Sequence, residues 1–226
     1  MRKIDKNPPP NSFLEYTKKT NPEDPNYKPT YDGLDTNEKE RLQLSLLNEQ
    51  GWVCGYCMQN INQKNMKIEH HCEQTICNGE NGTIDRTLDY TNMLAVCMGV
   101  AGRKEIYCDS KKSQFDILTG LPMVLSPMKT PHMAAITYSS TGLIESGITR
   151  HENELNKFLS LNTKHLKDLR ERKFRKIYAA SKHTKPAVEI AKMKKILEND
   201  LQMSAGNKFS NSFPGLSEYM LKTFCK

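Results

Sequence analysis

The sequence has no long apolar segment, and this absence excludes several classes of protein. Its longest mostly apolar run extends from Met93 to Gly102, far short of the roughly 20 residues that a transmembrane helix needs. The first residues, MRKIDKNPPP, are charged but lack the apolar stretch of a secretory signal, so we expect a cytoplasmic protein with no membrane association. A P-loop of the form G-x-x-x-x-G-K-[ST] is also missing, so any control by ATP must come from another protein.

Acidic residues are fewer than basic ones. The chain of 226 residues has 33 Lys and Arg against 26 Asp and Glu, a net charge of +7, and 37% of its residues are hydrophobic. The excess is concentrated between Leu161 and Asp200, where 12 basic residues accompany 5 acidic ones. Such an asymmetry suggests a polyanionic partner, usually nucleic acid. A solvated helix face explains a basic stripe equally well when nothing else supports a partner.

Cysteines are spaced for metal binding rather than for disulfides. There are seven, an odd number, and the first two form the Cys-x-x-Cys pair Cys54 and Cys57. With no export signal, such a pair indicates metal ligation. It can fill two tetrahedral positions on a zinc ion, and we expect Cys97 and Cys108 to fill the other two. A zinc ion closed by four thiolates is structural, because no position is left for water or substrate.

Two further cysteines compete for the second half of this zinc site. Cys72 and Cys77 lie nearer in sequence to the first pair. We favour Cys97 and Cys108, because they bracket the point at which the following helix must be anchored. Cys72, Cys77 and Cys225 are then interpreted as ordinary thiols.

A group of polar residues follows the first cysteine pair and has the chemistry of phosphodiester hydrolysis. It consists of Glu69, His70, His71, Asn92 and Asp109. A neutral imidazole can take a proton from water near pH 7. Carboxylates suit Mg²⁺ or Mn²⁺, and an Asn amide can fix the loop behind the histidine. Each residue alone has an ordinary structural explanation, but their combination and order favour a catalytic site.

Basic residues near this group are candidates for contacts with backbone phosphates. Lys111 and Lys112 lie two and three residues after Asp109, the last of the polar residues. Lys173, Arg175 and Lys176 belong to the basic C-terminal region. We expect all five to contact nucleic acid if the chain binds it.

Local patterns predict an α+β protein. Asp35 with Glu38 forms a capping box that begins a helix ending at Gly51. The other elements expected are a Pro-rich extended arm over residues 1–35, strands at 67–71 and 90–96, a helix at 109–118, a hairpin within 135–144, helices from 151 and over 186–201, and an amphipathic end over 209–226. The expected division is an arm (1–34), a core with the cysteine and polar residues (35–120) and a hairpin with basic helices (121–226).

The order of these motifs resembles that of the HNH endonucleases, which share the ββα-metal fold. The resemblance is carried by the following residues: Cys54-x-x-Cys57, Ile68-Glu69-His70, Asn92-Met93-Leu94, Cys97 and Cys108-Asp109-x-x-Lys112. Further similarity to the HNH subunit of Septu-type antiphage defence systems, the PtuB family, which also occurs as a retron-associated effector, is found at these positions: Met1–Ile4, Cys97-x-Gly99, Leu159–Asn162, Leu166 and Arg170.

The resemblance implies a role for each polar residue. His70 would be the general base, and Glu69 and Asp109 would bind a catalytic Mg²⁺ or Mn²⁺ ion. Asn92 would orient the loop. The second histidine, His71, is the alternative base, because some nucleases use the first of two adjacent histidines as a metal ligand.

The resemblance also implies the partners. It predicts a DNA endonuclease restrained or licensed by a PtuA-like ATPase of the ABC/SMC type. In a retron setting, a reverse transcriptase with its msDNA would accompany it, and RNA, including tRNA, is the alternative substrate. A different class remains open from the residues themselves: a zinc-binding module that binds nucleic acid or protein without catalysis.

Overall fold

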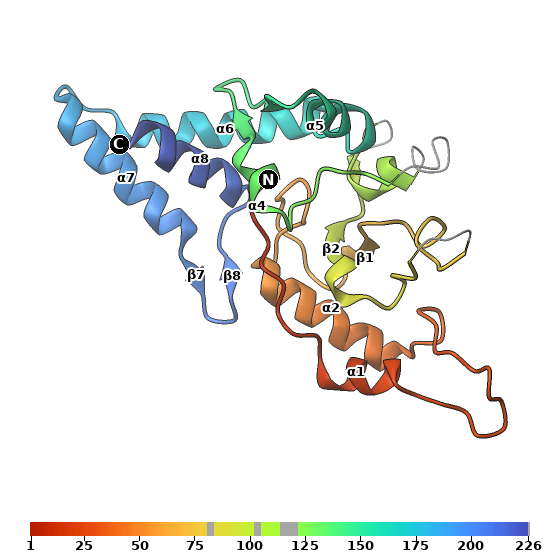
Figure 1. The fold of residues 1–226 in the computed structure, drawn as a ribbon. Helices are drawn as coiled ribbons and strands as arrows, with labels where there is room; N and C mark the ends of the chain where they lie inside the picture. Colours follow the sequence, from red (N-terminus) through yellow and green to blue (C-terminus); the bar gives the residue numbers. More distant parts are fainter. Residues whose placement is uncertain (81–83, 102–104, 114–121, 226) are drawn as a thin grey trace.

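The computed structural model describes residues 1–80, 84–101, 105–113 and 122–225, and it is a mixed α+β fold (Figure 1). Its described strands form four separate two-stranded antiparallel sheets. The α+β class predicted from the sequence is therefore confirmed. In the part of the chain that the structure describes, no helix combines the length and the apolarity needed to cross a membrane.

The central sheet carries the polar residues singled out above. Strand β1 (Met66–His70) pairs antiparallel with β2 (Met93–Cys97), with His70 opposite Met93 and Met66 opposite Cys97. A short 3-10 helix, η1 (Tyr90–Asn92), leads into β2. Residues 109–113 are helical, and the remainder of the helix expected at 109–118 lies outside the described residues. Both predicted strands are confirmed to within a few residues.

Helix α2 (Thr36–Gln50) packs against β2 and begins and ends as its sequence predicts. The Asp35 side chain accepts a hydrogen bond from the backbone N–H of Glu38, and Gly51 ends the helix in the left-handed conformation. A side chain at Gly51 would also collide with the ring of Phe209. The last residue, Gln50, is buried and hydrogen bonds both backbone groups of Ala95, which fixes the helix against the strand.

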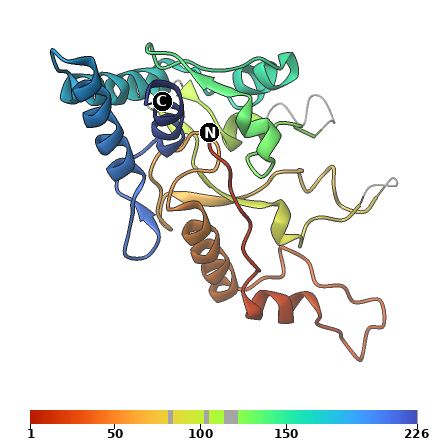
Figure 2. The same ribbon diagram turned by 60° about the vertical axis from the view of Figure 1, so that its left-hand side comes forward.

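The N-terminal segment is more ordered than a Pro-rich arm suggests. It contains helix α1 (Asn11–Thr17), which starts directly after three consecutive prolines, where proline is tolerated. Met1, Ile4 and Phe13 are buried in the same core as the rest of the chain. In both views the chain starts in the middle of the molecule and runs past α2 to α1 (Figures 1 and 2). At its start the Met1 ammonium donates a hydrogen bond to the Tyr138 hydroxyl.

The C-terminal half is a hairpin followed by helices, as predicted. Strands β5 (Ile136–Tyr138) and β6 (Ile144–Ser146) form the hairpin. Helices α6 (Lys164–Ser181) and α7 (Pro186–Leu201) diverge from the turn that joins them, and α8 (Pro214–Phe224) lies between them (Figure 1). The helix expected from residue 151 begins as α5 (Thr149–Asn153) and the π-helical turn η2 (Glu154–Phe158). The sequence did not suggest the following short elements: β3 (Val100–Ala101), β4 (Glu105–Ile106), α4 (Thr130–Ala134), β7 (Met203–Ser204) and β8 (Lys208–Phe209).

A buried arginine connects this hairpin to α6. Arg170 is only 1% exposed, and its guanidinium donates to the backbone oxygens of Gly142 and Leu161, each at 2.7 Å. Gly142 has φ = 79°, and a Cβ there would lie 2.2 Å from the backbone oxygen of Lys167. The turn thus requires glycine, and Arg170 has a structural role in the protein.

Candidate functional site

Four cysteines come together as predicted for the zinc site. Cys54, Cys57, Cys97 and Cys108 are buried, and their sulfur atoms all lie within 4.8 Å of one another. The Cys54–Cys108 and Cys57–Cys97 sulfur distances are 3.9 and 3.7 Å. Zinc–sulfur bonds of about 2.3 Å in a tetrahedron require sulfur atoms about 3.8 Å apart. The donor set therefore fits a metal such as zinc, and the choice of Cys97 and Cys108 over their rivals is confirmed.

Backbone hydrogen bonds hold this cluster in shape. The N–H of Gly55 donates to Ala95 on β2, and the N–H of Cys108 donates to Leu159 in the C-terminal half. Burial opposes ionisation of the Cys54 thiol, but hydrogen bonds from the neighbouring thiols, first that of Cys108, bring its pKa well below the usual value.

The interpretation of Cys72 and Cys77 as ordinary thiols is wrong, because the two form a disulfide. They are five residues apart, and the loop between them carries Glu73 and Gln74. Cys225 is a free thiol, as expected. No local pattern predicts a disulfide here, and the expected cytoplasmic location argues against one.

Three carboxylates gather beside the end of β1. Glu69 and Asp109 were predicted to be metal ligands, and Glu73 joins them, with one oxygen of each within 4.8 Å of the other two. Two lysines pair with the group: Lys112 contacts Glu69 at 3.0 Å and Glu73 at 3.1 Å, and Lys67 pairs with Asp109. Mg²⁺ ligand oxygens about 2.1 Å from the ion lie roughly 3 to 4 Å apart, which is close to the spacing of these three oxygens.

The two predicted ligands have opposite pKa shifts. Burial raises the pKa of the Glu69 carboxyl well above its usual value, although the nearby Lys112 ammonium opposes the shift. For Asp109, burial acts in the same direction, but hydrogen bonds from Glu69 and Lys67 outweigh it and lower the pKa. Such opposite shifts are expected when two buried carboxyl groups stand close together.

The His70 ring is held in one orientation. Its Nε2 donates to the backbone oxygen of Thr87 at 2.9 Å, and its Nδ1 accepts from the Gln74 amide at 2.9 Å, in the tautomer that satisfies both partners. The edge of the ring meets Tyr31 with 4.7 Å between centroids. Burial lowers the His70 pKa below 6.5, so the ring is neutral at pH 7 and Nδ1 carries the lone pair.

His71 has a different environment. Its Nδ1 lies 3.5 Å from the Tyr56 hydroxyl, which donates to Glu69 at 3.0 Å. Burial, with the charge of Lys112 as the next cause, lowers the His71 pKa to about 3. The Tyr56 hydroxyl thus connects His71 to the Glu69 carboxylate, but His71 is a very weak base.

Asn92 fixes the loop that follows the two histidines, as the sequence predicts. Its side chain is fully buried, and its Oδ1 accepts from the Cys72 N–H at 2.8 Å while its Nδ2 donates to the Cys72 oxygen at 2.9 Å. The Asn92 backbone oxygen accepts from the His71 N–H at 2.7 Å. This amide therefore connects β2 to the end of β1.

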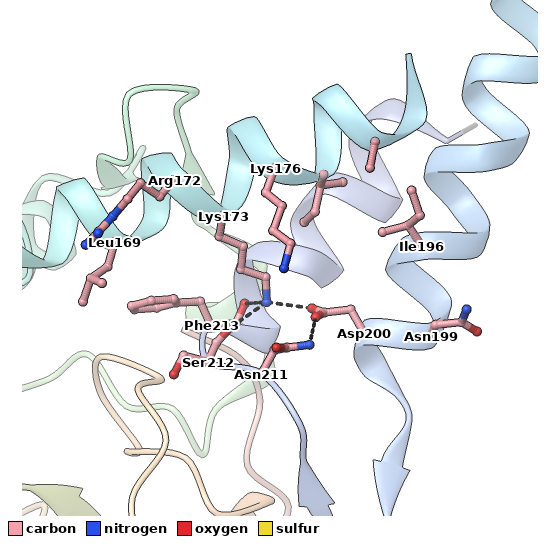
Figure 3. A pocket seen from close by; sticks show the side chains of 12 residues that line it. Leu169, Arg172, Lys173, Lys176, Ile196, Asn199, Asp200, Asn211, Ser212 and Phe213 are labelled. Carbon is pink, nitrogen blue, oxygen red and sulfur yellow. Dashed lines mark hydrogen bonds and ion pairs between the residues drawn. The ribbon is translucent and has the colours of Figure 1, made fainter. Parts of the chain in front are cut away.

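Two of the predicted phosphate contacts are wrong, because both side chains form ion pairs and have little or no access to solvent: Lys112 is fully buried and Lys173 is only 12% exposed. Lys112 is completely buried among the carboxylates. Lys173 donates to Asp200 at 2.6 Å and to the Ser212 oxygen at 2.6 Å, on one wall of a cavity of about 520 Å³ between α6 and α7 (Figure 3). Through these two hydrogen bonds the Lys173 ammonium joins α6 to the end of α7 and to the segment before α8, although burial lowers its pKa.

The remaining phosphate candidates are accessible. Arg175 is 76% exposed and pairs with Glu171 one turn earlier, and Lys176 is exposed beside the same cavity. Lys111 is partly exposed. These three residues keep the charge and the access that a phosphate contact needs.

Sequence reasoning missed three residues of the polar site. Glu73 lies four residues after Glu69, in the loop beyond β1, and Gln74 follows it. No sequence motif at this spacing marks either residue as part of a site. Tyr56 lies inside the first cysteine pair, which was interpreted only as a zinc knuckle.

No protein-family model matches the chain, and none of the curated proteins matches it either.

Proposed function

We propose that the protein is a metal-dependent endonuclease of the HNH type that hydrolyses phosphodiester bonds. One observation carries the proposal: a neutral histidine of fixed tautomer, His70, lies at the end of a strand whose preceding residue, Glu69, belongs to a buried three-carboxylate cluster. The two functions that hydrolysis needs, a base and a cation site, thus come from adjacent residues.

The order of elements supports the same proposal. An antiparallel pair, β1 and β2, is followed by helical residues that begin at Asp109. With the short pair β3 and β4 between them, this order is compatible with the ββα-metal motif that the resemblance implies, in which the strand pair would present the base and the helix a ligand. The Asn92 clamp on the loop between the strands fits the orienting role that the HNH resemblance implies.

The three carboxylates fit a Mg²⁺ or Mn²⁺ ion, because they offer hard oxygen donors in a buried setting. A bound ion would neutralise charge on the phosphate and on the leaving oxygen. Glu69, Glu73 and Asp109 would hold it. Zinc at the four cysteines has a separate structural task, since a closed thiolate site has no position for substrate.

His70 is the better of the two candidate bases. Its Nε2–H is fixed by the Thr87 oxygen, which leaves the Nδ1 lone pair to take a proton from water once the Gln74 amide gives way. A base works best when its pKa lies near the working pH. The pKa of His71, about 3, is far from that range, and its ring is positioned by Tyr56.

Exposed basic residues would bind the substrate backbone. Lys111, Arg175 and Lys176 have accessible charges, and the C-terminal region supplies the positive net charge of the chain. DNA is the proposed substrate, with RNA as the alternative. As the resemblance implies, we also propose that a PtuA-like ATPase controls the nuclease, because the sequence has no P-loop of its own.

Incubation of the purified protein with plasmid DNA and with total RNA tests this proposal. We expect Mg²⁺ or Mn²⁺ to support cleavage of one of them, EDTA to stop it, and zinc to remain bound throughout. The assay is run with and without the ATPase partner. Binding without cleavage in every combination would favour the non-catalytic zinc module, for which the four-cysteine cluster is the supporting observation.

A further inference from the structure

The Lys112 ammonium lies among the groups proposed to bind the divalent ion. Its Nζ is 3.0 Å from Glu69 Oε1, 3.1 Å from Glu73 Oε1 and 3.4 Å from the backbone oxygen of His70. The side chain has no exposed surface. The lysine thus reaches the carboxylates from within the protein, from the helical residues that begin at Asp109.

A fully buried lysine requires compensating charge, and these carboxylates provide it. Glu69, Glu73 and Asp109 have three formal negative charges when ionised, and Lys112 with Lys67 has two positive ones. In the structure Lys112 therefore serves as the counter-ion of Glu69 and Glu73. An ammonium is a compact point charge with three donors, so it satisfies several oxygens at once, much as a small cation does.

A divalent ion cannot bind the same oxygens while the ammonium remains. An ion held by Glu69 and Glu73 would compete with Nζ for their oxygens, because the ammonium already pairs with Oε1 of both residues. Even beside it, two like charges a few ångströms apart in a buried site repel strongly. If the ion replaced the Lys112 ammonium, its two positive charges and the one of Lys67 would balance the three carboxylates.

We propose that Lys112 is the resident cation of this site and that a divalent ion binds only by displacing its ammonium, with Glu73 as the third carboxylate ligand. The inference rests on the proposed metal-dependent function and adds to it a competition between a side chain and the ion. Lys112 is a positioning residue in the ion-free protein, since it keeps the three carboxylates together until the ion arrives.

Amine labelling of the unmodified full-length protein tests the displacement directly. The protein is treated briefly with an acetylating reagent in EDTA, in Mg²⁺ and in Mn²⁺, and each lysine is quantified by mass spectrometry. We expect Lys112 to be protected in EDTA and to become labelled when the ion saturates the site. Lys111, its partly exposed neighbour, should be labelled to a similar degree throughout. Lys112 protected at saturating ion would overturn the proposal.

Ion affinity in matched variants gives a second readout that needs no cleavage. Mn²⁺ binding is measured by calorimetry on zinc-loaded protein with unchanged circular dichroism. Removing the competing charge in Lys112→Met should tighten Mn²⁺ binding by about tenfold or more, because a unit charge at this distance in a buried site exceeds one tenfold step. Lys111→Met should bind Mn²⁺ as the parent does, and Glu73→Gln should bind it more weakly. Equal affinities of Lys112→Met and parent would contradict the inference.

If Lys112→Met does not fold, Lys112→Arg and Glu73→Gln keep the test decisive. Lys112→Arg retains the positive charge and should leave Mn²⁺ binding weak, whereas loss of a ligand in Glu73→Gln weakens it further. The inference and the proposed function fail differently. Ion-dependent cleavage with Lys112 protected overturns only the inference, whereas labelling of Lys112 on ion binding without cleavage of any nucleic acid overturns only the nuclease.

Discussion

The side-chain amide of Asn92 hydrogen bonds both backbone groups of Cys72, accepting from its N–H at 2.8 Å and donating to its oxygen at 2.9 Å. The two residues are 20 positions apart in sequence. This pairing fixes the chain directly after His70 and His71, so the direction of both rings depends on one buried amide. It also holds one end of the disulfide loop that carries Glu73 and Gln74.

Replacement of Asn92 by Ala should therefore loosen the catalytic loop as well as the fold. The buried Cys72 N–H and oxygen lose their partners, which costs about 2 to 4 kcal/mol of unfolding free energy. We expect cleavage to fall more than stability alone explains, because His70 loses its fixed position. Urea denaturation and cleavage rates measure the two effects, and hydrogen exchange at Cys72 localises them. An unchanged exchange rate at Cys72 would contradict the pairing.

Loss of one zinc ligand should unfold the region around the cluster. In Cys54→Ser the metal has three thiolates and a weak hydroxyl, so we expect zinc content to fall and the melting temperature to drop by several degrees. Cys225→Ser, which changes a free thiol away from the cluster, is the matched control and should retain both. Zinc absent from well-folded parent protein would disprove the structural site.

The basic residues of α6 should separate into two kinds. Arg175→Ala with Lys176→Ala should leave stability within about 0.5 kcal/mol of the parent, because the exposed Arg175–Glu171 pair contributes little. Each lost phosphate contact should reduce the salt-dependence slope of nucleic-acid binding by about 0.9. Fluorescence anisotropy at several salt concentrations measures this slope. A slope equal to that of the parent would mean that these charges do not meet the backbone.

Lys173 should behave in the opposite way. Its removal leaves Asp200 without its ammonium partner and the Ser212 oxygen without a donor, so Lys173→Ala should lose roughly 2 to 4 kcal/mol of stability. We expect the salt slope of binding to stay unchanged. Urea denaturation compares the unfolding free energy of Lys173→Ala with that of the Arg175 and Lys176 variants. A Lys173→Ala protein as stable as the parent, but with a reduced salt slope of binding, would show that Lys173 contacts nucleic acid.

His71 should make the protein sensitive to acid. Its pKa is about 3 in the fold against about 6.5 in the unfolded chain, so below pH 6.5 the unfolded state binds more protons and stability falls with falling pH. From pH 6.5 to 5 this group alone removes about 2 kcal/mol. The raised pKa of Glu69 acts in the opposite direction, since its folded form holds a proton that the unfolded form releases.

The comparison of parent with His71→Gln isolates the contribution of this ring. The variant should lose about 2 kcal/mol less than the parent between pH 6.5 and 5, as measured by urea unfolding at each pH. Equal pH dependence in the two proteins would show that His71 is not buried in its neutral form.

The sequence predicted what depends on local signals. Asp35 and Gly51 bound α2 because capping chemistry acts over a few residues, and the Cys54–Cys57 spacing identifies a metal knuckle wherever the chain folds. The strand that presents His70 and the loop-fixing role of Asn92 also followed from motif order.

What the sequence could not provide depends on burial. Lysine is mostly exposed in proteins, so Lys112 and Lys173 were assigned to the surface, and only the packed structure reveals the carboxylates that compensate each. Glu73 joins the site through a loop closed by the Cys72–Cys77 disulfide, and no periodic pattern marks such a loop. The outcome for both lysines has one cause: ion pairs between distant residues leave no trace in local sequence.

Cleavage by parent, His70→Ala and His71→Ala proteins in Mg²⁺ or Mn²⁺ tests the central claim most directly. All three should be folded and zinc-loaded, and each is given plasmid DNA and total RNA with and without the ATPase partner. The account predicts that the parent cuts, that His70→Ala does not, and that His71→Ala retains measurable activity. Full activity of His70→Ala, or cleavage by the parent that EDTA leaves untouched, would contradict it.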